Sequence, residues 1–192
     1  MGWTWYHCAA RKRNGKPDVK AECDGMLNYG ERTRVLKSTM VGSTYYAAVQ
    51  DNSDGSVWAA IFHTSVNSRD YYDFGYKDMD ETMGPYQHNC PDSILDFLTP
   101  TDSEWARQWR DRCRKHNRQE REWASIPDGA RYIWTVPSDQ FKHLSKGDKV
   151  TIYKRSLNPF RKRSKKVWII EQNGCYLDRR FVDLDLLERA AA

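Results

Sequence analysis

The chain has 192 residues, of which 39% are hydrophobic and 30% charged, a balance typical of a globular protein and not of a disordered one. This length allows an ordinary domain plus a small one, or a single larger domain. The longest apolar runs are far shorter than the ~20 residues that cross a bilayer, and the N-terminus lacks the basic-then-apolar pattern of a secretory signal. We therefore expect no membrane contact.

The net charge of +5 is divided unevenly along the chain. Residues 1–100 carry ten Lys/Arg against thirteen Asp/Glu, and residues 101–125 carry seven against five. Residues 126–192 carry fourteen against eight. A basic segment favours an anionic partner, so we expect one for the last third of the chain alone.

The cysteines are odd in number, widely spread and without a C-x-x-C pair, which favours reduced thiols in a cytoplasm. They are Cys8, Cys23, Cys90, Cys113 and Cys175. We expect most of them to be small buried hydrophobic residues.

Residue patterns in the first hundred residues predict an α+β domain with short helices and a mixed or antiparallel sheet. Asp18 is placed to cap a short helix, because its carboxylate can accept hydrogen bonds from the first free N–H groups. The predicted strands are residues 2–10, 33–40, 43–50 and 57–64. Both faces of the last strand are apolar, which indicates a central position in the sheet.

Residues 67–91 follow no period, and we predict a long polar-aromatic loop of the kind that often carries function. A short helix is expected at residues 91–98, where Thr99-Pro100 ends it.

Residues 101–125 predict an amphipathic linking helix. Thr101 and Glu104 have the spacing of a capping box, in which each side chain accepts from a free backbone N–H of the other residue. Bulky apolar or small residues then recur at every fourth position, as Trp105, Trp109 and Cys113, among many cations.

Residues 126–192 predict a small, basic, β-rich module. The expected strands are residues 131–136, 149–155, 167–172 and 175–181, followed by a helical turn. Between the last two strands stands Asn173-Gly174, a strong signal for a two-residue hairpin. Several short strands in so few residues favour a small barrel, SH3-like or OB-like. The chain is thus expected to divide into 1–100, 101–125 and 126–192.

Carboxylates and imidazoles in or near the predicted loop form the first candidate site. Such groups can divide general acid and base roles or bind a divalent metal. The candidate catalytic residues are His63, Asp78, Asp80, Glu81 and His88. No spacing here matches an established metal motif, so we assign no metal ligands and no cofactor. The alternative interpretation is that these side chains cap turns, bond to backbone amides and face solvent.

A second hypothesis pairs Cys8 or Cys90, as a nucleophile, with a histidine. The candidate histidines are His7, His63 and His88. For His63 the alternative is a hydrogen-bonded histidine at the edge of the core.

The third candidate is a basic segment, residues 154–166, in which seven of the thirteen residues are Lys or Arg. Such an arm contacts phosphates, with an affinity that falls steeply with salt. The candidate nucleic-acid-binding residues are Lys154, Arg155, Arg161, Lys162, Arg163, Lys165, Lys166, Arg179 and Arg180. No pattern favours base-specific readout, and the alternative is a solvated loop that keeps the protein soluble.

Several stretches carry a family resemblance: MGWTWYH at residues 1–7, then residues 20–24, 35–49, 76–85, 90–95 and 99–102. Through them, about the first 115 residues resemble a family of uncharacterised proteins carried by bacteriophages and integrative mobile elements. The resemblance implies a mobile-element origin and the cytoplasm of a bacterial host. It brings no known activity and therefore no catalytic residues.

Three functions follow as hypotheses. The first is a nucleic-acid-associated protein of a phage or mobile element, whose basic module holds the polyanion. The second is a metal-assisted hydrolase or nucleic-acid-modifying enzyme with its site at residues 70–90, which requires the carboxylates there to converge with His63 or His88. The third is a non-enzymatic inhibitor of a host defence system, with a host protein as its partner.

Overall fold

The computed structural model describes residues 2–28, 30–66, 72–85, 87–135, 144–156, 166–178, 182 and 184–190. The chain separates into two compact units, Met1–Asn117 (unit 1) and Arg118–Ala192 (unit 2). Each unit has its own antiparallel sheet with few helices, so the chain has α+β architecture. No described helix is both long enough and apolar enough to cross a membrane.

Unit 1 is built on a five-stranded sheet in the order β1-β5-β4-β3-β2. Its strands are β1 (Thr4–Tyr6), β2 (Thr33–Val41), β3 (Thr44–Asp51), β4 (Val57–Val66) and β5 (Phe74–Asp80). Every pairing is antiparallel, and β4 is the central strand, as its two apolar faces predicted. The first strand is shorter than expected, because only three residues pair with β5.

The prediction of a long loop at residues 67–91 was wrong for its middle part. Phe74–Asp80 forms β5, and Glu81–Met83 forms the 3-10 helix η1. In β5 Phe74 and Tyr76 face one side of the sheet, while Lys77 and Met79 face the other. Its period of two was hidden because charged residues occupy the end of the strand.

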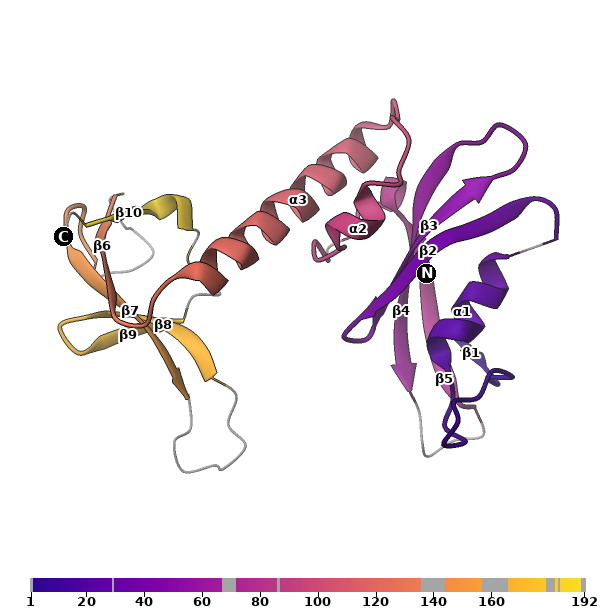
Figure 1. The fold of residues 1–192 in the computed structure, drawn as a ribbon, viewed down its shortest axis with the longest axis horizontal. Helices are drawn as coiled ribbons and strands as arrows, with labels where there is room; N and C mark the ends of the chain where they lie inside the picture. The colour runs from indigo at the N-terminus through magenta and orange to yellow at the C-terminus, as the bar shows by residue number, and fades with distance from the viewer. Residues whose placement is uncertain are drawn as a thin grey trace. The chain divides into compact units, whose positions relative to one another are not determined.

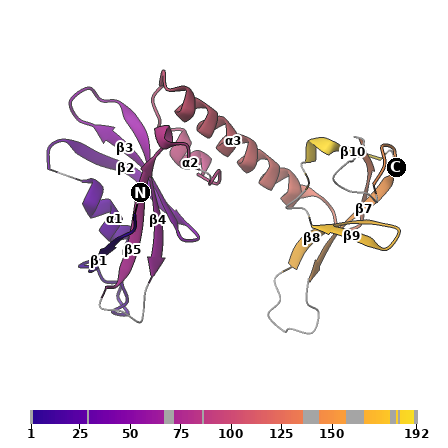
Figure 2. The ribbon, with the colours of Figure 1, turned by 180° about the vertical axis from the view of Figure 1, so that it is seen from behind.

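Helices cover both faces of the unit 1 sheet (Figure 1), as the reverse view confirms (Figure 2). They are α1 (Val19–Leu27), α2 (Asp92–Leu95) and α3 (Glu104–Ser125). On the α1 face, Cys23 packs with Tyr45 and Phe62. On the opposite face, α2 and α3 pack against β3 and β4 through residues such as Trp109 and Ile61. Because side chains point alternately to the two faces of the sheet along β4, this strand contributes residues to a core on each face.

Of the two predicted N-terminal helix caps, that of α1 is confirmed and that of α3 is wrong. Asp18 caps α1, accepting from the N–H of Ala21 at 3.2 Å. The predicted capping box of α3 was wrong, because the Ser103 hydroxyl accepts from the N–H of Ala106 at 3.3 Å. Thr101 instead accepts from the N–H of Ser103, in a turn that precedes the helix.

Unit 2 contains a second antiparallel sheet in the order β10-β6-β7-β8-β9. Its strands are β6 (Ala130–Trp134), β7 (Lys149–Ser156), β8 (Lys166–Gln172), β9 (Cys175–Asp178) and β10 (Leu187–Arg189). Trp134, Ile152 and Ile170 lie at the centre of its core. Within the described residues the sheet is not closed, so the predicted small barrel is not confirmed.

The structure at the two edges of the unit 2 sheet tests two predictions, a hairpin and a helical turn. The Asn173-Gly174 hairpin is confirmed: Gln172 pairs with Cys175, and the two turn residues have φ of 49° and 81°. Positive φ at both positions is the requirement of a type I′ turn. At the other edge, the predicted helical turn is limited to η3 (Leu184–Leu186), after which β10 pairs with β6.

Candidate functional site

The five candidate catalytic residues do not lie together, and the three of them in β4 and β5 are divided between the two faces of the unit 1 sheet. Asp78 pairs with Phe62 and Asp80 with Ala60, which places both carboxylates on the α1 face. His63 has the same parity in β4 as Ile61, and so belongs to the face covered by α2 and α3.

Glu81 is occupied by a buried ion pair on the α2/α3 face. Its two carboxylate oxygens accept from Nε and one terminal nitrogen of Arg110, at 2.6 and 2.7 Å. One of them also accepts from the N–H of Ala59 at 3.4 Å, while Arg110 donates to the carbonyl of Thr99. The Glu81 side chain is 3% exposed and that of Arg110 12%. This geometry joins α3 to the sheet and leaves Glu81 without access to a substrate.

Asp80 caps a helix, whereas Asp78 is exposed to solvent. Asp80 caps η1, because its Oδ1 accepts from the N–H of Thr82 at 2.7 Å. The Asp78 side chain is exposed, and burial together with the Asp78 charge raises the pKa of Tyr76.

The pKa of each of the two histidines is lowered by burial and by a neighbouring positive charge. His63 is buried, with Nδ1 at 3.3 Å from the Thr44 hydroxyl, and burial together with Lys77 lowers its pKa. Burial also lowers the pKa of His88, as do the charges of Arg112 and His116. The convergence that the hydrolase hypothesis requires is therefore not found among the described residues. Nor do these residues contain a cluster of three or more His, Cys, Asp or Glu side chains that could hold a metal.

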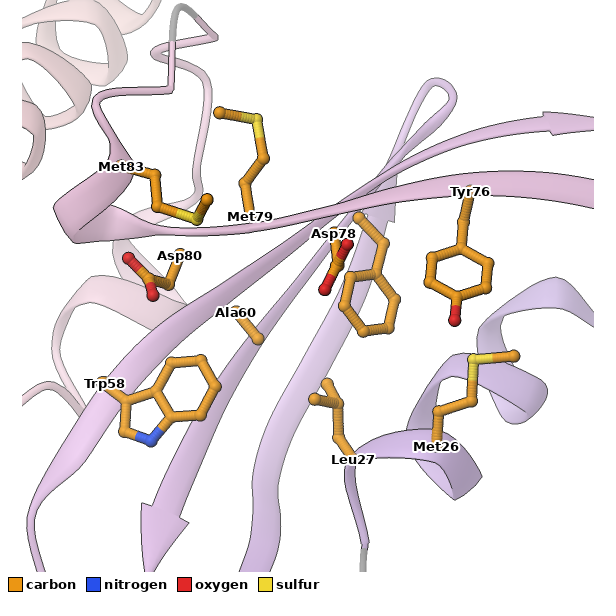
Figure 3. A pocket seen from close by; sticks show the side chains of 10 residues that line it. Met26, Leu27, Trp58, Ala60, Tyr76, Asp78, Met79, Asp80 and Met83 are labelled. Atoms are coloured by element: carbon orange, nitrogen blue, oxygen red, sulfur yellow. The ribbon is translucent and has the colours of Figure 1, made fainter. Parts of the chain in front are cut away.

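A pocket of about 320 Å³ lies on the α1 face and is the place where Asp78 and Asp80 come together. Figure 3 shows both carboxylates on the side of β5 that faces Trp58 and Leu27. The lining residues are Met26 and Leu27 of α1, Trp58, Ala60 and Phe62 of β4, Tyr76, Asp78, Met79 and Asp80 of β5, and Met83 of η1.

The chemistry of this pocket suits a cation with an apolar body. Its walls are aromatic rings and thioethers, and its only charged lining groups are the two carboxylates. A cation is attracted both by such carboxylates and by the faces of rings such as Trp58 and Tyr76. The lining thus offers two carboxylates and several apolar side chains to such a cation.

The sequence did not identify the aromatic part of this pocket. Tyr76 lies in the segment that was predicted to be a loop, and the apolar pattern around Trp58 predicts a central strand without indicating a pocket. Recognising the period of two over residues 74–80 would have placed Tyr76, Asp78 and Asp80 on one face.

The hypothesis of a nucleophilic cysteine is not supported by the electrostatics of the thiols. A nucleophile needs a lowered pKa, whereas burial raises the pKa of Cys90 and, together with Glu22, that of Cys8. Burial also raises the pKa of Cys23 and of Cys113, each to about 12.

We expect a thiol reagent to modify one cysteine rapidly in the native full-length chain. Cys175 is exposed, while the other four cysteines are buried. A chromogenic disulfide reagent should therefore give one fast equivalent at neutral pH and four more after unfolding in denaturant. Cys175→Ser should remove the fast phase. Rapid modification of Cys8 or Cys90 in the folded chain would contradict the burial described here.

The structure describes only part of the basic segment of unit 2. Lys154 is exposed and lies over the ring of Trp168, with Nζ 5.3 Å from its centroid. Arg155 lies in β7 and Lys166 in β8, and of these two only the backbone is described. The other candidates lie outside the described residues: Arg161, Lys162, Arg163, Lys165, Arg179 and Arg180.

Comparisons of the chain with protein-family models, with curated proteins and with solved structures found no match.

Proposed function

We propose that this protein binds nucleic acid, as a protein of a phage or mobile element, and that the basic C-terminal part holds the phosphate backbone. The observation that carries the proposal is the division of charge. Residues 126–192 carry fourteen Lys/Arg against eight Asp/Glu, while residues 1–100 carry ten against thirteen. A nucleic acid is a polyanion, and a segment with such an excess of Lys and Arg attracts its phosphates.

The outer face of the unit 2 sheet is compatible with this role. Arg131, Thr151, Glu171 and Tyr176 form one row across four strands, on the face opposite the core. Tyr176 is exposed and offers an aromatic surface, while Arg131 offers a cation. Because Glu171 stands between them, the attraction for a polyanion depends on the wider basic segment and not on this row.

Contacts of this kind predict a strong dependence on salt. Each phosphate neutralised by Lys or Arg releases condensed counterions, so log K falls against log salt with a slope of about −0.9 per phosphate on duplex DNA and about −0.7 on single strands. Binding without base contacts should show little preference among sequences of equal length.

The test is a titration of labelled duplex and single-stranded oligonucleotides with the full-length chain over a series of salt concentrations. The variant replaces Arg161, Lys162 and Arg163 with Gln. We expect it to bind more weakly at every salt concentration and to reduce the slope on single strands by about 2, the loss of three phosphate contacts. A matched control replaces Lys20, Arg32 and Arg34 of unit 1 with Gln, which changes the net charge by the same amount.

Two results would overturn the proposal. One is the absence of binding to any oligonucleotide at low salt. The other is an equal loss of affinity and slope in the control, which would show that net charge and not the basic segment determines binding.

A further inference from the structure

The pocket on the α1 face of unit 1 has the size and the lining of a small-molecule site. Its volume of about 320 Å³ lies within the range of such sites, roughly 300 to 1,000 Å³. Apolar side chains from α1, β4, β5 and η1 form most of the lining, and two charged groups stand among them. Apolar walls around a few polar groups are typical of sites that bind and orient a small ligand. The proposed nucleic-acid contacts of unit 2 make no use of this pocket.

The strand register places the two carboxylates of the pocket next to each other. Asp78 pairs with Phe62 and Asp80 with Ala60, so both side chains point to the α1 face, as Figure 3 shows. Alternate residues of a strand are about 7 Å apart along it, close enough for two negative charges to repel each other. This repulsion favours a positive charge between them.

No cation among the described residues neutralises these carboxylates. The Asp78 side chain has no hydrogen bond or ion pair there, and Asp80 accepts from the N–H and the hydroxyl of Thr82. Burial raises the pKa of Tyr76, and the charge of Asp78 raises it further, so this charge acts on the aromatic part of the pocket. Rings and carboxylates therefore act on the same space.

The rings of the pocket form a fixed wall. The centroids of Phe62 and Tyr76 are 5.3 Å apart, and Phe62 also stacks on Tyr45, with centroids 5.5 Å apart. Trp58 precedes Ala60 by two residues on the same face of β4 and is half-buried. We call Trp58, Phe62 and Tyr76 the aromatic wall. Rings held by the sheet lose little conformational freedom when a ligand binds, which favours affinity.

The donor set suits an organic cation better than a divalent metal ion. Ca²⁺ takes about six to eight oxygen ligands and Mg²⁺ about six, whereas the side chains of the lining supply two carboxylates and one phenol. The rest of the lining is aromatic, aliphatic or thioether, and such groups do not replace the water of a hydrated metal ion. An ammonium ion with a carbon body matches both parts, because its charge is attracted by carboxylates and by ring faces.

We propose that this pocket binds a small organic cation, an amine whose ammonium group lies beside Asp78 and Asp80 and whose carbon body lies against the aromatic wall. The inference goes beyond the proposed function and does not depend on it. Two carboxylates repel the phosphates of a nucleic acid, so the pocket is not part of a phosphate-binding surface. A free amine and the lysine side chain of a partner share the chemistry that the pocket recognises.

The test compares phenethylammonium with 2-phenylethanol, its neutral isostere, by titration into the full-length ¹⁵N-labelled chain. Amide chemical shifts in β4 and β5 should change and saturate with phenethylammonium. We expect it to bind about 3- to 100-fold more tightly than the alcohol, because only the ammonium ion gains the ring faces and the carboxylates. Nα-acetyllysine methylamide is titrated in parallel: tighter binding than phenethylammonium identifies a lysine of a partner as the source, and weaker binding a free amine.

A double variant removes the charges and keeps the shape of the pocket. Asp78→Asn with Asp80→Asn should weaken phenethylammonium binding by about 2- to 30-fold and leave the alcohol unaffected. Asparagine also caps helices, so η1 keeps its acceptor. The matched control is Asp102→Asn with Asp111→Asn, two exposed carboxylates of unit 1 outside the pocket lining. It makes the same change in net charge and should leave both affinities unchanged.

Three results would overturn the inference. The first is equal binding of the ammonium ion and the alcohol, which would show an apolar pocket without preference for charge. The second is the absence of shifts in β4 and β5 at millimolar phenethylammonium. The third is an equal loss of affinity in the control variant. Thermal melts establish that each variant is folded, and the comparison of the two ligands on the wild-type chain needs no variant. Oligonucleotide binding is measured separately, so failure of this inference leaves the proposed function intact.

Discussion

Replacing Glu81 with alanine is expected to lower the free energy of unfolding of unit 1 by about 3 to 5 kcal/mol. The substitution leaves the guanidinium of Arg110 buried without the carboxylate that neutralises it. It also removes the acceptor of the Ala59 N–H in the central strand. The cost arises from the uncompensated charge, because the attraction within a buried pair largely offsets the desolvation of its two members.

A double variant separates this explanation from a simple loss of contacts. Glu81→Leu with Arg110→Met replaces both charges with apolar groups of similar size, and we expect it to recover most of the stability lost in Glu81→Ala. The exposed ion pair between Arg114 of α3 and Asp96, which follows α2, supplies a matched control. Asp96→Ala should cost no more than about 1 kcal/mol.

The free energy of unfolding is measured by urea titration of the full-length chain. Hydrogen exchange of the β3 and β4 amides then shows how much of the change belongs to unit 1. The second readout is needed because two compact units can unfold in separate transitions. Equal effects of Glu81→Ala and Asp96→Ala would contradict the burial and the bidentate geometry of the pair. A catalytic role of Glu81 instead predicts a stable Glu81→Ala variant, since a carboxylate kept for chemistry contributes little to the core.

Trp109→Ala is expected to destabilise unit 1 by about 3 to 5 kcal/mol. Its ring is fully buried between α3 and the sheet, 6.5 Å from the ring of Tyr46, and its Nε1 donates to the carbonyl of Gln87 at 2.9 Å. Alanine would leave a large cavity, and the carbonyl of Gln87 would lose this donor. Both losses act in the same direction.

Trp105 is the matched control for this prediction. It stands one turn earlier on the same helix, but 63% of its surface is exposed. Trp105→Ala should change the free energy of unfolding by no more than about 1 kcal/mol. The same urea titration compares the two variants, and Trp109→Phe should fall between them because it leaves a smaller cavity. If the two alanine variants were equally stable, α3 would not be packed on the sheet as described.

The two tryptophans show a limit of the helical pattern. Residues 105, 109 and 113 recur at every fourth position and were all expected on one apolar side. A spacing of four exceeds the 3.6 residues of a helical turn, so such a series drifts around the helix. Trp109 and Cys113 are buried in the core against the sheet, whereas Trp105 is exposed. Which member of the series is buried depends on what packs against each turn of the helix, and this is not local information.

The candidate catalytic residues show the same limit in a strand. Asp80 and Glu81 are adjacent in sequence, yet they lie on opposite faces of the sheet, one capping η1 near the pocket and the other paired with Arg110. A shift of one residue reverses the face in a β-strand, so closeness in sequence is a poor guide to closeness in a site. The partner of Glu81 lies 29 residues further along the chain, and no spacing rule connects them.

Features that depend on neighbouring residues could be predicted from the sequence alone. Asp18 capped α1 as expected, and Asn173-Gly174 formed its hairpin, because a cap or a tight turn is set by the side chains and φ angles of a few residues. The division of charge between the two ends of the chain is likewise a property of the sequence alone. Three other features could not be read from local sequence: the existence of β5, the pairing of Glu81 with Arg110, and the meeting of Trp58 and Tyr76 in one pocket. Each of these depends on contacts between residues far apart in the chain, whose free energy is gained only when the sheet and its helices assemble.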